Sequence, residues 1–175
     1  MKTLHLLLLL IPFFGIAQTK EKPKELAVSP NTYIQSVDNL TLSASFEIVK
    51  RVNEAAHSLN KKVAIAILDA SGTIVLLTRD DGVGPNNADA AKRKAFTALS
   101  TKTPTLLLLR NVQANDDTKN LNTLPELLLL SGGSPIWYKG TIVGSIGVAG
   151  GGSPENDDFL AKSATIQEFG ITTSK

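Results

Sequence analysis

Cysteine is absent from this 175-residue sequence, and methionine, histidine and aromatic residues are scarce. Without cysteine the chain can form no disulfide, no thiolate metal site, no cysteine nucleophile and no lipid-modified cysteine. The fold must therefore be stabilised by packing alone. Met1 is the only methionine, and His5 and His57 are the only histidines.

The N-terminus carries the pattern of a secretory signal peptide. Lys2 is followed by an apolar stretch over residues 4–14 and by the small-x-small triplet 15–17. The stretch is shorter than the roughly 20 residues that a membrane-spanning helix needs. A membrane anchor or a buried helix is the alternative, but the order of charge, apolar run and small residues favours a signal peptide over residues 1–17. We therefore expect cleavage before Gln18, export to the periplasm or the extracellular medium, and no membrane span in the mature chain.

Charge is balanced along the sequence. Eighteen lysines and arginines face sixteen aspartates and glutamates, and the formal net charge is +2. Basic residues are interspersed with acidic ones, so nucleic-acid binding is not expected. The one dense basic cluster, residues 92–94, is typical of a solvated helix face.

The remainder divides into a linker and one domain. Residues 18–38 are rich in Lys, Glu, Pro and Ser, which is typical of a flexible linker, and residues 39–175 have the length of a single domain. Hydrophobic periodicity and turn residues predict helices over 42–60, 87–99, 105–113 and 154–169, and strands over 63–68, 73–78, 134–138 and 141–148.

These elements predict an α+β fold with a mainly antiparallel sheet of two hairpins flanked by helices. The second hairpin turns at Lys139-Gly140. Strands 63–68 and 141–148 are apolar on both faces, so each face must be covered by helices or by another subunit. We therefore expect a homo-oligomer.

Four motifs resemble the GlcG/HbpS family, formerly a domain of unknown function and related to the C-terminal domain of PduO. They are VAIAILDASG at 63–72, RDDG at 79–82, the stretch 88–98 with KRKA, and GGSPI at 132–136 continued by the glycines up to 151. The resemblance covers most of residues 40–169. It implies a profilin-like sandwich, homo-oligomers, association with haem or corrinoids, and a glycolate, propanediol or haem-sensing context. The motifs supply these candidate ligand-binding residues: Asp81, Gly82, Lys94, Gly132, Gly133, Pro135, Gly150 and Gly151.

The glycine runs 132–133 and 150–152 lie next to predicted strand ends. Glycine permits positive φ and a close approach of a ligand or a strand to the backbone. The second run precedes a helix and resembles an anion-binding nest. Acidic residues such as Asp157 already place negative charge there, which favours a self-capped helix instead. Asp81-Gly82 is either a pocket wall or a solvated turn.

Haem iron is usually bound by His, Cys, Met or Tyr. The mature chain offers His57, Tyr33 and Tyr138, with lysines as weaker candidates. On its helix His57 lies about 130° from the apolar stripe, which indicates a surface position, and Tyr138 fits ordinary strand packing. A tetrapyrrole ligand is therefore implied by the resemblance and not by an evident axial ligand.

Enzyme motifs are weak. A two-histidine zinc site cannot form around one mature histidine, and no Gly-x-Ser-x-Gly sequence accompanies His57. We therefore expect an exported homo-oligomer that binds a small molecule, with haem or another tetrapyrrole as the candidate, near the glycine-rich strand ends. An enzyme acting on a small acid or redox substrate is the alternative, and a ligand-free assembly module is a third.

Overall fold

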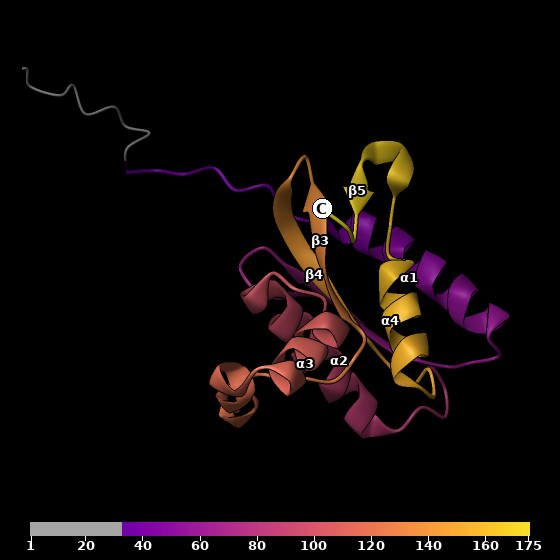
Figure 1. Ribbon diagram of the computed structural model, residues 1–175. Helices are drawn as coiled ribbons and strands as arrows, with labels where there is room; N and C mark the ends of the chain where they lie inside the picture. The colour runs from indigo at the N-terminus through magenta and orange to yellow at the C-terminus, as the bar shows by residue number, and fades with distance from the viewer. Residues whose placement is uncertain (1–32) are drawn as a thin grey trace, which may run out of the picture. The chain divides into compact units, whose positions relative to one another are not determined.

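The computed structural model describes residues 33–175; the predicted signal peptide and most of the predicted linker lie outside the described residues. A compact unit begins at Ser36 (Figure 1). Its elements, in chain order, are α1 (Leu42–Ser58), β1 (Ala64–Asp69), β2 (Ile74–Arg79), α2 (Pro85–Thr101), α3 (Thr105–Ala114), the 3-10 helix η2 (Asp116–Thr123), β3 (Gly133–Tyr138), β4 (Thr141–Ala149), α4 (Pro154–Lys162), the 3-10 helix η3 (Gln167–Phe169) and β5 (Ile171–Thr172).

The strands form one antiparallel sheet in the order β2-β1-β4-β3-β5. The two hairpins, β1–β2 and β3–β4, join through β1 and β4, so that Ala64 lies opposite Ala149. The predicted α+β fold with two hairpins is confirmed, and it has an additional short strand, β5. Figure 1 shows α1 and α4 on one side of the sheet and α2 with α3 on the other.

The two faces of the sheet carry side chains of different size. Toward α1 and α4, branched residues such as Ile65 and Ile146 pack with Ile48 of α1 in the main core. Toward α2, the strands present Ala66 and Gly147. Because the α2 face of the sheet is made of small residues, the backbone of α2 approaches the strands closely.

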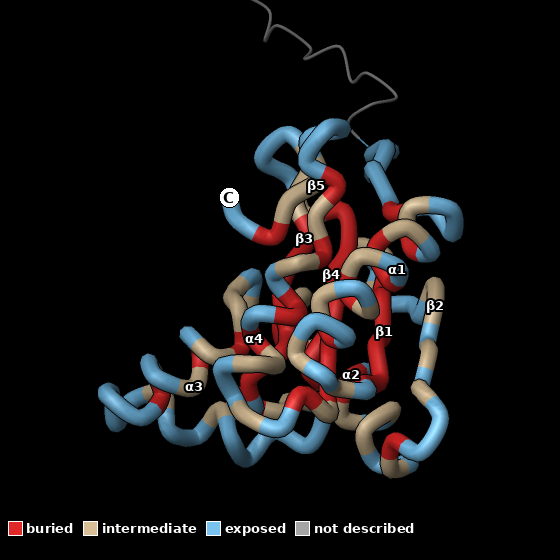
Figure 2. Tube along the Cα trace, turned by 90° about the vertical axis from the view of Figure 1, so that its right-hand side faces the viewer, coloured by how far each residue is buried: buried red, intermediate tan, exposed pale blue. Residues whose placement is uncertain are grey.

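The chain's own helices cover both faces of the central strands. Figure 2 shows β1 as buried along its length, whereas the edge strand β2 is intermediate or exposed. A second subunit is therefore not needed to bury the apolar central strands, which removes one of the two grounds for expecting an oligomer.

The last helix is shorter than predicted. We expected it to reach residue 169, but α4 ends at Lys162, where the Ser163 amide bonds to the carbonyls of Phe159 and Leu160. The chain then turns so that Ala164 and Ile166 enter the core. Ile166 also pairs with Ile171 here, so tertiary packing and strand pairing override the helical pattern of the sequence.

The segment after this turn forms η3 and β5, which the sequence did not predict. β5 pairs with β3, placing Ile171 opposite Tyr138. No helix within residues 33–175 combines the length and the apolar character needed to cross a membrane.

Candidate functional site

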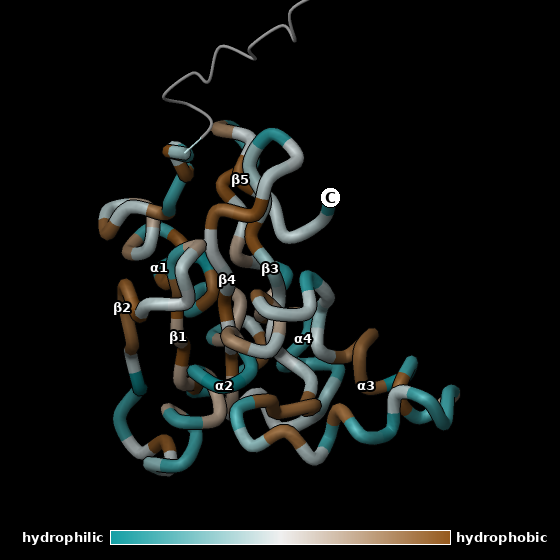
Figure 3. The backbone as a smooth tube through the Cα atoms, turned by 90° about the vertical axis from the view of Figure 1, so that its left-hand side faces the viewer, coloured by the Kyte–Doolittle hydropathy of each residue, from teal (hydrophilic) through white to brown (hydrophobic). Residues whose placement is uncertain are grey.

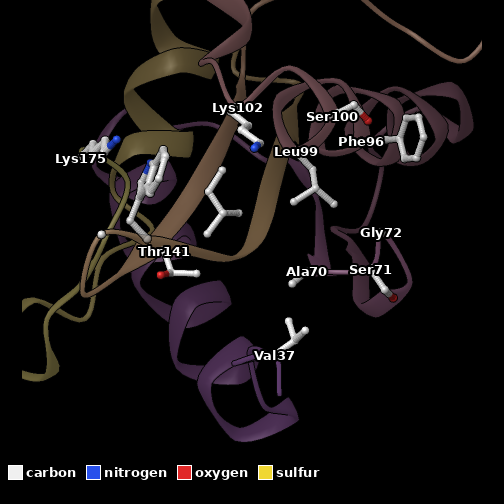
Figure 4. A pocket seen from close by; sticks show the side chains of 13 residues that line it. Val37, Ala70, Ser71, Gly72, Phe96, Leu99, Ser100, Lys102, Thr141 and Lys175 are labelled. Carbon is white, nitrogen blue, oxygen red and sulfur yellow. The ribbon is translucent and has the colours of Figure 1, made fainter. Parts of the chain in front are cut away.

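A cleft of about 660 Å³ lies beside the turn of the β3–β4 hairpin; we name it the hairpin cleft (Figure 4). Its walls come from the chain before α1, the β1–β2 turn, the C-terminal end of α2, the β3–β4 hairpin and the last residue of the sequence. The lining residues are Val37, Ala70, Ser71, Gly72, Phe96, Leu99, Ser100, Lys102, Trp137, Gly140, Thr141, Ile142 and Lys175.

The cleft forms because α2 is shorter than the hairpin that it covers. The helix ends at Thr101, and Lys102 adopts a left-handed backbone (φ 53°) that turns the chain toward α3. The hairpin continues to its turn at Lys139-Gly140. Trp137 and its strand partner Ile142 therefore line an open space at this end of the sheet.

Hydrogen bonds fix the wall opposite α2. The Leu40 amide donates to the carbonyl of Val143 at 3.0 Å, and the Ala70 amide donates to Asn39 Oδ1 at 2.9 Å. These two bonds hold the chain before α1 against the sheet and against the β1–β2 turn.

Asp69 orders the β1–β2 turn. Its Oδ1 accepts hydrogen bonds from the Ser71 and Thr73 amides, both at 2.9 Å. Burial alone raises the pKa of Asp69, but the hydrogen bonds from Ser71, Thr73 and Gly72 outweigh it, so the pKa lies below its usual value. The turn is thus held by a carboxylate that stays ionised at neutral pH.

The chemistry of the hairpin cleft suits a flat apolar ligand with anionic groups. Phe96, Leu99 and Trp137 supply aromatic and aliphatic surface, and Lys102 and Lys175 supply positive charge. Lys175 Nζ lies 5.5 Å from the centre of the Trp137 ring. No carboxylate side chain within residues 33–175 forms an ion pair with either lysine. Hydroxyls and amines are the only ionisable or nucleophilic side-chain groups in the lining, so it offers no paired general acid and base.

Three of the predicted site residues meet in a second cleft. Asp81, Gly82 and Gly150 line a space of about 440 Å³ with Lys62 and Asn87; we name it the rim cleft. It lies at the other end of the sheet, where β1 begins and β2 and β4 end. Lys62 Nζ donates to the Asp81 carbonyl at 3.2 Å. A ligand-binding role for these residues stays a prediction.

Lys94, another predicted site residue, is buried in an internal ion pair. Its Nζ lies 2.7 Å from Asp157 Oδ2 and donates to the Val148 carbonyl at 2.9 Å. Asp157 Oδ1 in turn accepts from the Gly151 amide at 2.7 Å. The glycine loop at 150–152 therefore binds the Asp157 carboxylate of the same chain in place of an external anion. This agrees with the alternative of a self-capped helix.

The glycine pair 132–133 lies directly beneath α2. A Cβ atom at Gly133 would lie 2.3 Å from the Lys94 carbonyl oxygen, and one at Gly132 would lie 2.5 Å from the Val148 carbonyl oxygen. The structure thus explains Gly133 by the close approach of α2, and Gly132 by the close approach of β4 and by its positive φ of 106°.

The remaining predicted site residues lie apart. His57 is exposed near the end of α1, as its helical phase predicts. Tyr138 is half-buried against the main core, with Lys139 Nζ 4.9 Å from its ring centre. Pro135 is buried in β3, opposite Ser145. None of the three lines the hairpin cleft, and no cluster of three or more His, Cys, Asp or Glu side chains suited to a metal ion occurs in the described part of the chain.

Sequence reasoning did not single out the residues of the hairpin cleft. Trp137 lies in a strand and Lys102 in a helix-terminal segment, positions where packing and solvation are the ordinary interpretation. The only local signal is Pro104, which ends α2 and thereby leaves the hairpin uncovered.

Comparison with known proteins places this fold in a family. A family model described as haem degrading protein HbpS-like matches residues 40–165. An uncharacterised 15.0 kDa protein of Citrobacter freundii is 27% identical over 132 residues, which are 74% of this chain and 92% of that protein.

Two solved structures carry the same fold. A double mutant of Streptomyces reticuli HbpS is 34% identical, with a TM-score of 0.71 over 78% of this chain and 92% of that one. A PduOC:haem complex is 27% identical, with a TM-score of 0.68 over 78% of this chain and 99% of that one. On the evidence of the family match over residues 40–165, the chain belongs to the HbpS-like family.

Proposed function

We propose that this protein binds haem or a closely related tetrapyrrole. The observation that carries the proposal is the likeness to the PduOC:haem complex, which extends over 99% of that chain. The family description, haem degrading, points to the same ligand.

The hairpin cleft fits such a ligand in size and chemistry. Its volume of about 660 Å³ falls within the range of roughly 300–1,000 Å³ typical of small-molecule sites. Aromatic and aliphatic side chains match a porphyrin ring, and the two lysines match its two propionate carboxylates. His57 and Tyr138, the usual kinds of iron ligand, lie outside the cleft. We therefore expect modest affinity that does not depend on one histidine.

A Soret-band titration of the mature protein tests this function. Wild type, His57→Ala and Tyr138→Phe are titrated with haem in parallel, and we expect similar spectra and affinities for all three. If His57→Ala alone abolishes binding, His57 is the axial ligand and the expected affinity pattern is wrong. If none of the three proteins binds haem, the proposed function falls, and the alternatives of an enzyme acting on a small acid or of an assembly module take its place.

Export is the second part of the proposal. The pattern of residues 1–17 supports cleavage between Ala17 and Gln18 and a periplasmic or extracellular protein. Mass spectrometry of protein recovered from outside the cytoplasm should give a chain that begins at Gln18. A soluble product that retains Met1 would overturn this part and leave haem binding untouched.

Haem breakdown is a second candidate function, favoured by the family description. Ring opening needs dioxygen and a reductant, so bound haem is incubated in air with ascorbate. Loss of the Soret band together with release of chelatable iron, faster than for free haem, would support breakdown. An unchanged Soret band would limit the function to binding.

A further inference from the structure

We propose that the hairpin cleft holds the tetrapyrrole by its ring face and carboxylates and not through its iron, so that a metal-free porphyrin binds about as tightly as haem. This inference rests on the proposed function and assigns its site. It makes Trp137 and Lys102 the main ligand-contacting residues.

The ring face is matched by one wall of the cleft. Trp137 is half-buried in β3, and Phe96 and Leu99 project from the last turns of α2. In Figure 4, Leu99 and Lys102 lie between Lys175 on one side of the cleft and Phe96 on the other. An apolar surface bordered by cations is complementary to a ring whose propionates emerge at one edge.

Lys102 is placed by an unusual backbone. Its φ of 53° lies in the left-handed region, where glycine is the ordinary residue at the end of a helix and a larger residue is strained. The sequence nevertheless places a lysine here, and its ammonium group makes no ion pair with any carboxylate side chain of residues 33–175. What distinguishes Lys102 from the other left-handed lysine, Lys139, is that Lys102 lines the apolar cleft, and strained residues in clefts are candidates for a functional role.

The iron finds no ordinary ligand in this cleft. The lining contains no His, Tyr, Met or Cys, which are the usual axial ligands of haem iron. Ring stacking and carboxylate pairing are present in protoporphyrin IX as well as in haem. The binding free energy from ring stacking and carboxylate pairing therefore does not depend on whether the porphyrin contains iron.

The test locates the ligand with the single tryptophan. Trp137 is the only tryptophan in the sequence, so protein labelled with 5-fluorotryptophan gives one fluorine resonance. Ring currents act over a few ångströms, so protoporphyrin IX stacked on Trp137 shifts this resonance, whereas a porphyrin bound elsewhere does not. We expect saturable shifts with protoporphyrin IX and a dissociation constant within about threefold of that for haem.

Affinity is then measured for Lys102→Gly, with Lys139→Asn as the matched control. Both variants remove one lysine with a left-handed backbone at the same end of the sheet, but Lys139 lies over the Tyr138 ring and does not line the cleft. We expect Lys102→Gly to bind protoporphyrin IX about two- to fivefold more weakly, because a carboxylate loses its charged partner. Lys139→Asn should bind like wild type.

The outcomes separate the site from the function. If haem binds but protoporphyrin IX leaves the Trp137 resonance unchanged, or if Lys102→Gly binds as wild type does, the site assignment is wrong while haem binding stands. If haem binds and protoporphyrin IX does not, the iron is ligated and the inference is overturned. If neither ligand binds, the proposed function itself fails.

Discussion

Left-handed backbone at residues other than glycine is confined, within residues 33–175, to Asn60, Lys102 and Lys139. An L-residue in this conformation costs about 1–2 kcal/mol relative to its relaxed backbone. Asn tolerates the region because of its short polar side chain, but lysine does not share this property. Lys102 and Lys139 are therefore positions where the sequence tolerates local strain.

Replacing Lys102 with glycine should stabilise the protein while weakening ligand binding. Glycine adopts the left-handed conformation without steric cost, so we expect the free energy of unfolding to rise by about 0.5–1 kcal/mol. The midpoint of urea denaturation should increase at constant m-value. Lys102→Ala, which retains the Cβ clash, should show no such gain; an equal gain for alanine would contradict strain as the cause.

Lys94 should behave as a structural residue. The side chains of Lys94 and Asp157 are 5% and 13% exposed, so removing one partner leaves the other charge nearly buried and without compensation. We expect Lys94→Met to lower the free energy of unfolding by about 3 kcal/mol. Lys92→Met removes an exposed lysine from the same helix and should change it by less than about 0.5 kcal/mol. A stable Lys94→Met variant that has lost haem binding would instead return Lys94 to the ligand site.

The candidate residues show what could be predicted at this scale. The exposure of His57 follows from helical phase alone, and the motif residues 81, 82 and 150 do meet at one cleft. The hairpin cleft could not be predicted, because it depends on where α2 ends relative to a hairpin almost 40 residues further along the chain. Single-sequence patterns carry no information about such a tertiary offset.

At the scale of elements, the contact between α2 and the sheet leaves no room for an added side-chain atom at Gly147. A Cβ atom at Gly147 would lie 1.9 Å from the Ala91 carbonyl oxygen and 2.7 Å from the Ala95 amide nitrogen. Both neighbours are backbone atoms of the helix, so the clash cannot be relieved by turning a side chain.

Gly147→Ala should therefore be strongly destabilising. We expect a loss of about 3 kcal/mol or a failure to fold, because the helix must move off the sheet. Gly84→Ala is the control: its φ is ordinary, and its added Cβ would meet only movable side-chain atoms, Asn86 Oδ1 at 3.0 Å and Asn87 Nδ2 at 3.8 Å. Thermal unfolding followed by circular dichroism compares the two, and equal melting temperatures would show that α2 adjusts more easily than this contact indicates.

The η3–β5 segment is connected to α1 by an exposed ion pair. The Arg51 guanidinium donates hydrogen bonds to Glu168 and, from Nε at 2.8 Å, to Glu47 Oε1. Its hydrogen bond to Glu168 is the main cause that lowers the pKa of that carboxyl group. Since the folded-state pKa is below the unfolded value of about 4.3, the stabilisation is complete above that value and is lost as the pH falls through the folded-state pKa.

Glu168→Gln tests this connection through pH. At pH 7 the variant should melt slightly below wild type, since the pair is solvent-exposed and screened by salt. The difference should shrink as the pH falls below about 4 and should vanish in acid. If the difference in melting temperature persists unchanged in acid, the loss of the Glu168 charge is not the cause of the destabilisation.

Elements with strong periodicity were predicted well, and the short one was not. α1, α2 and both hairpins follow from 3.6-residue and alternating patterns. β5 is a two-residue strand whose existence depends on pairing with β3, so its sequence alone does not distinguish it from a loop or a helix end.

At the scale of the whole molecule, apolar side chains remain exposed at the sheet edge. Ile74 and Leu77 of the edge strand β2 are 40% and 42% exposed, and Figure 3 shows β2 and α3 as hydrophobic segments at the periphery. An edge strand with exposed apolar side chains and unpaired backbone groups can pair with another chain.

We expect the mature protein to form a homo-oligomer. Light scattering coupled to size-exclusion chromatography should give a mass of at least two subunits at micromolar concentration. Adding salt should not dissociate the assembly if apolar contacts hold it together. A monomer at every concentration would leave the family resemblance as the only ground for assembly and would exclude it under these conditions.

The pairing of β1 with β4 also determines when the protein can fold. Ala64 meets Ala149, so the centre of the sheet closes only after the intervening chain has been synthesised. Each hairpin forms from local contacts, but the strand pairing that joins them spans a long loop, and pairings of this kind slow folding. Nascent chain that ends before residue 141 has β1 without its central partner and lacks the hydrophobic face of β4. If residues 1–17 act as the signal peptide that we propose, this late closure would keep the polypeptide unfolded during most of its synthesis, which is the state in which a chain is threaded across a membrane.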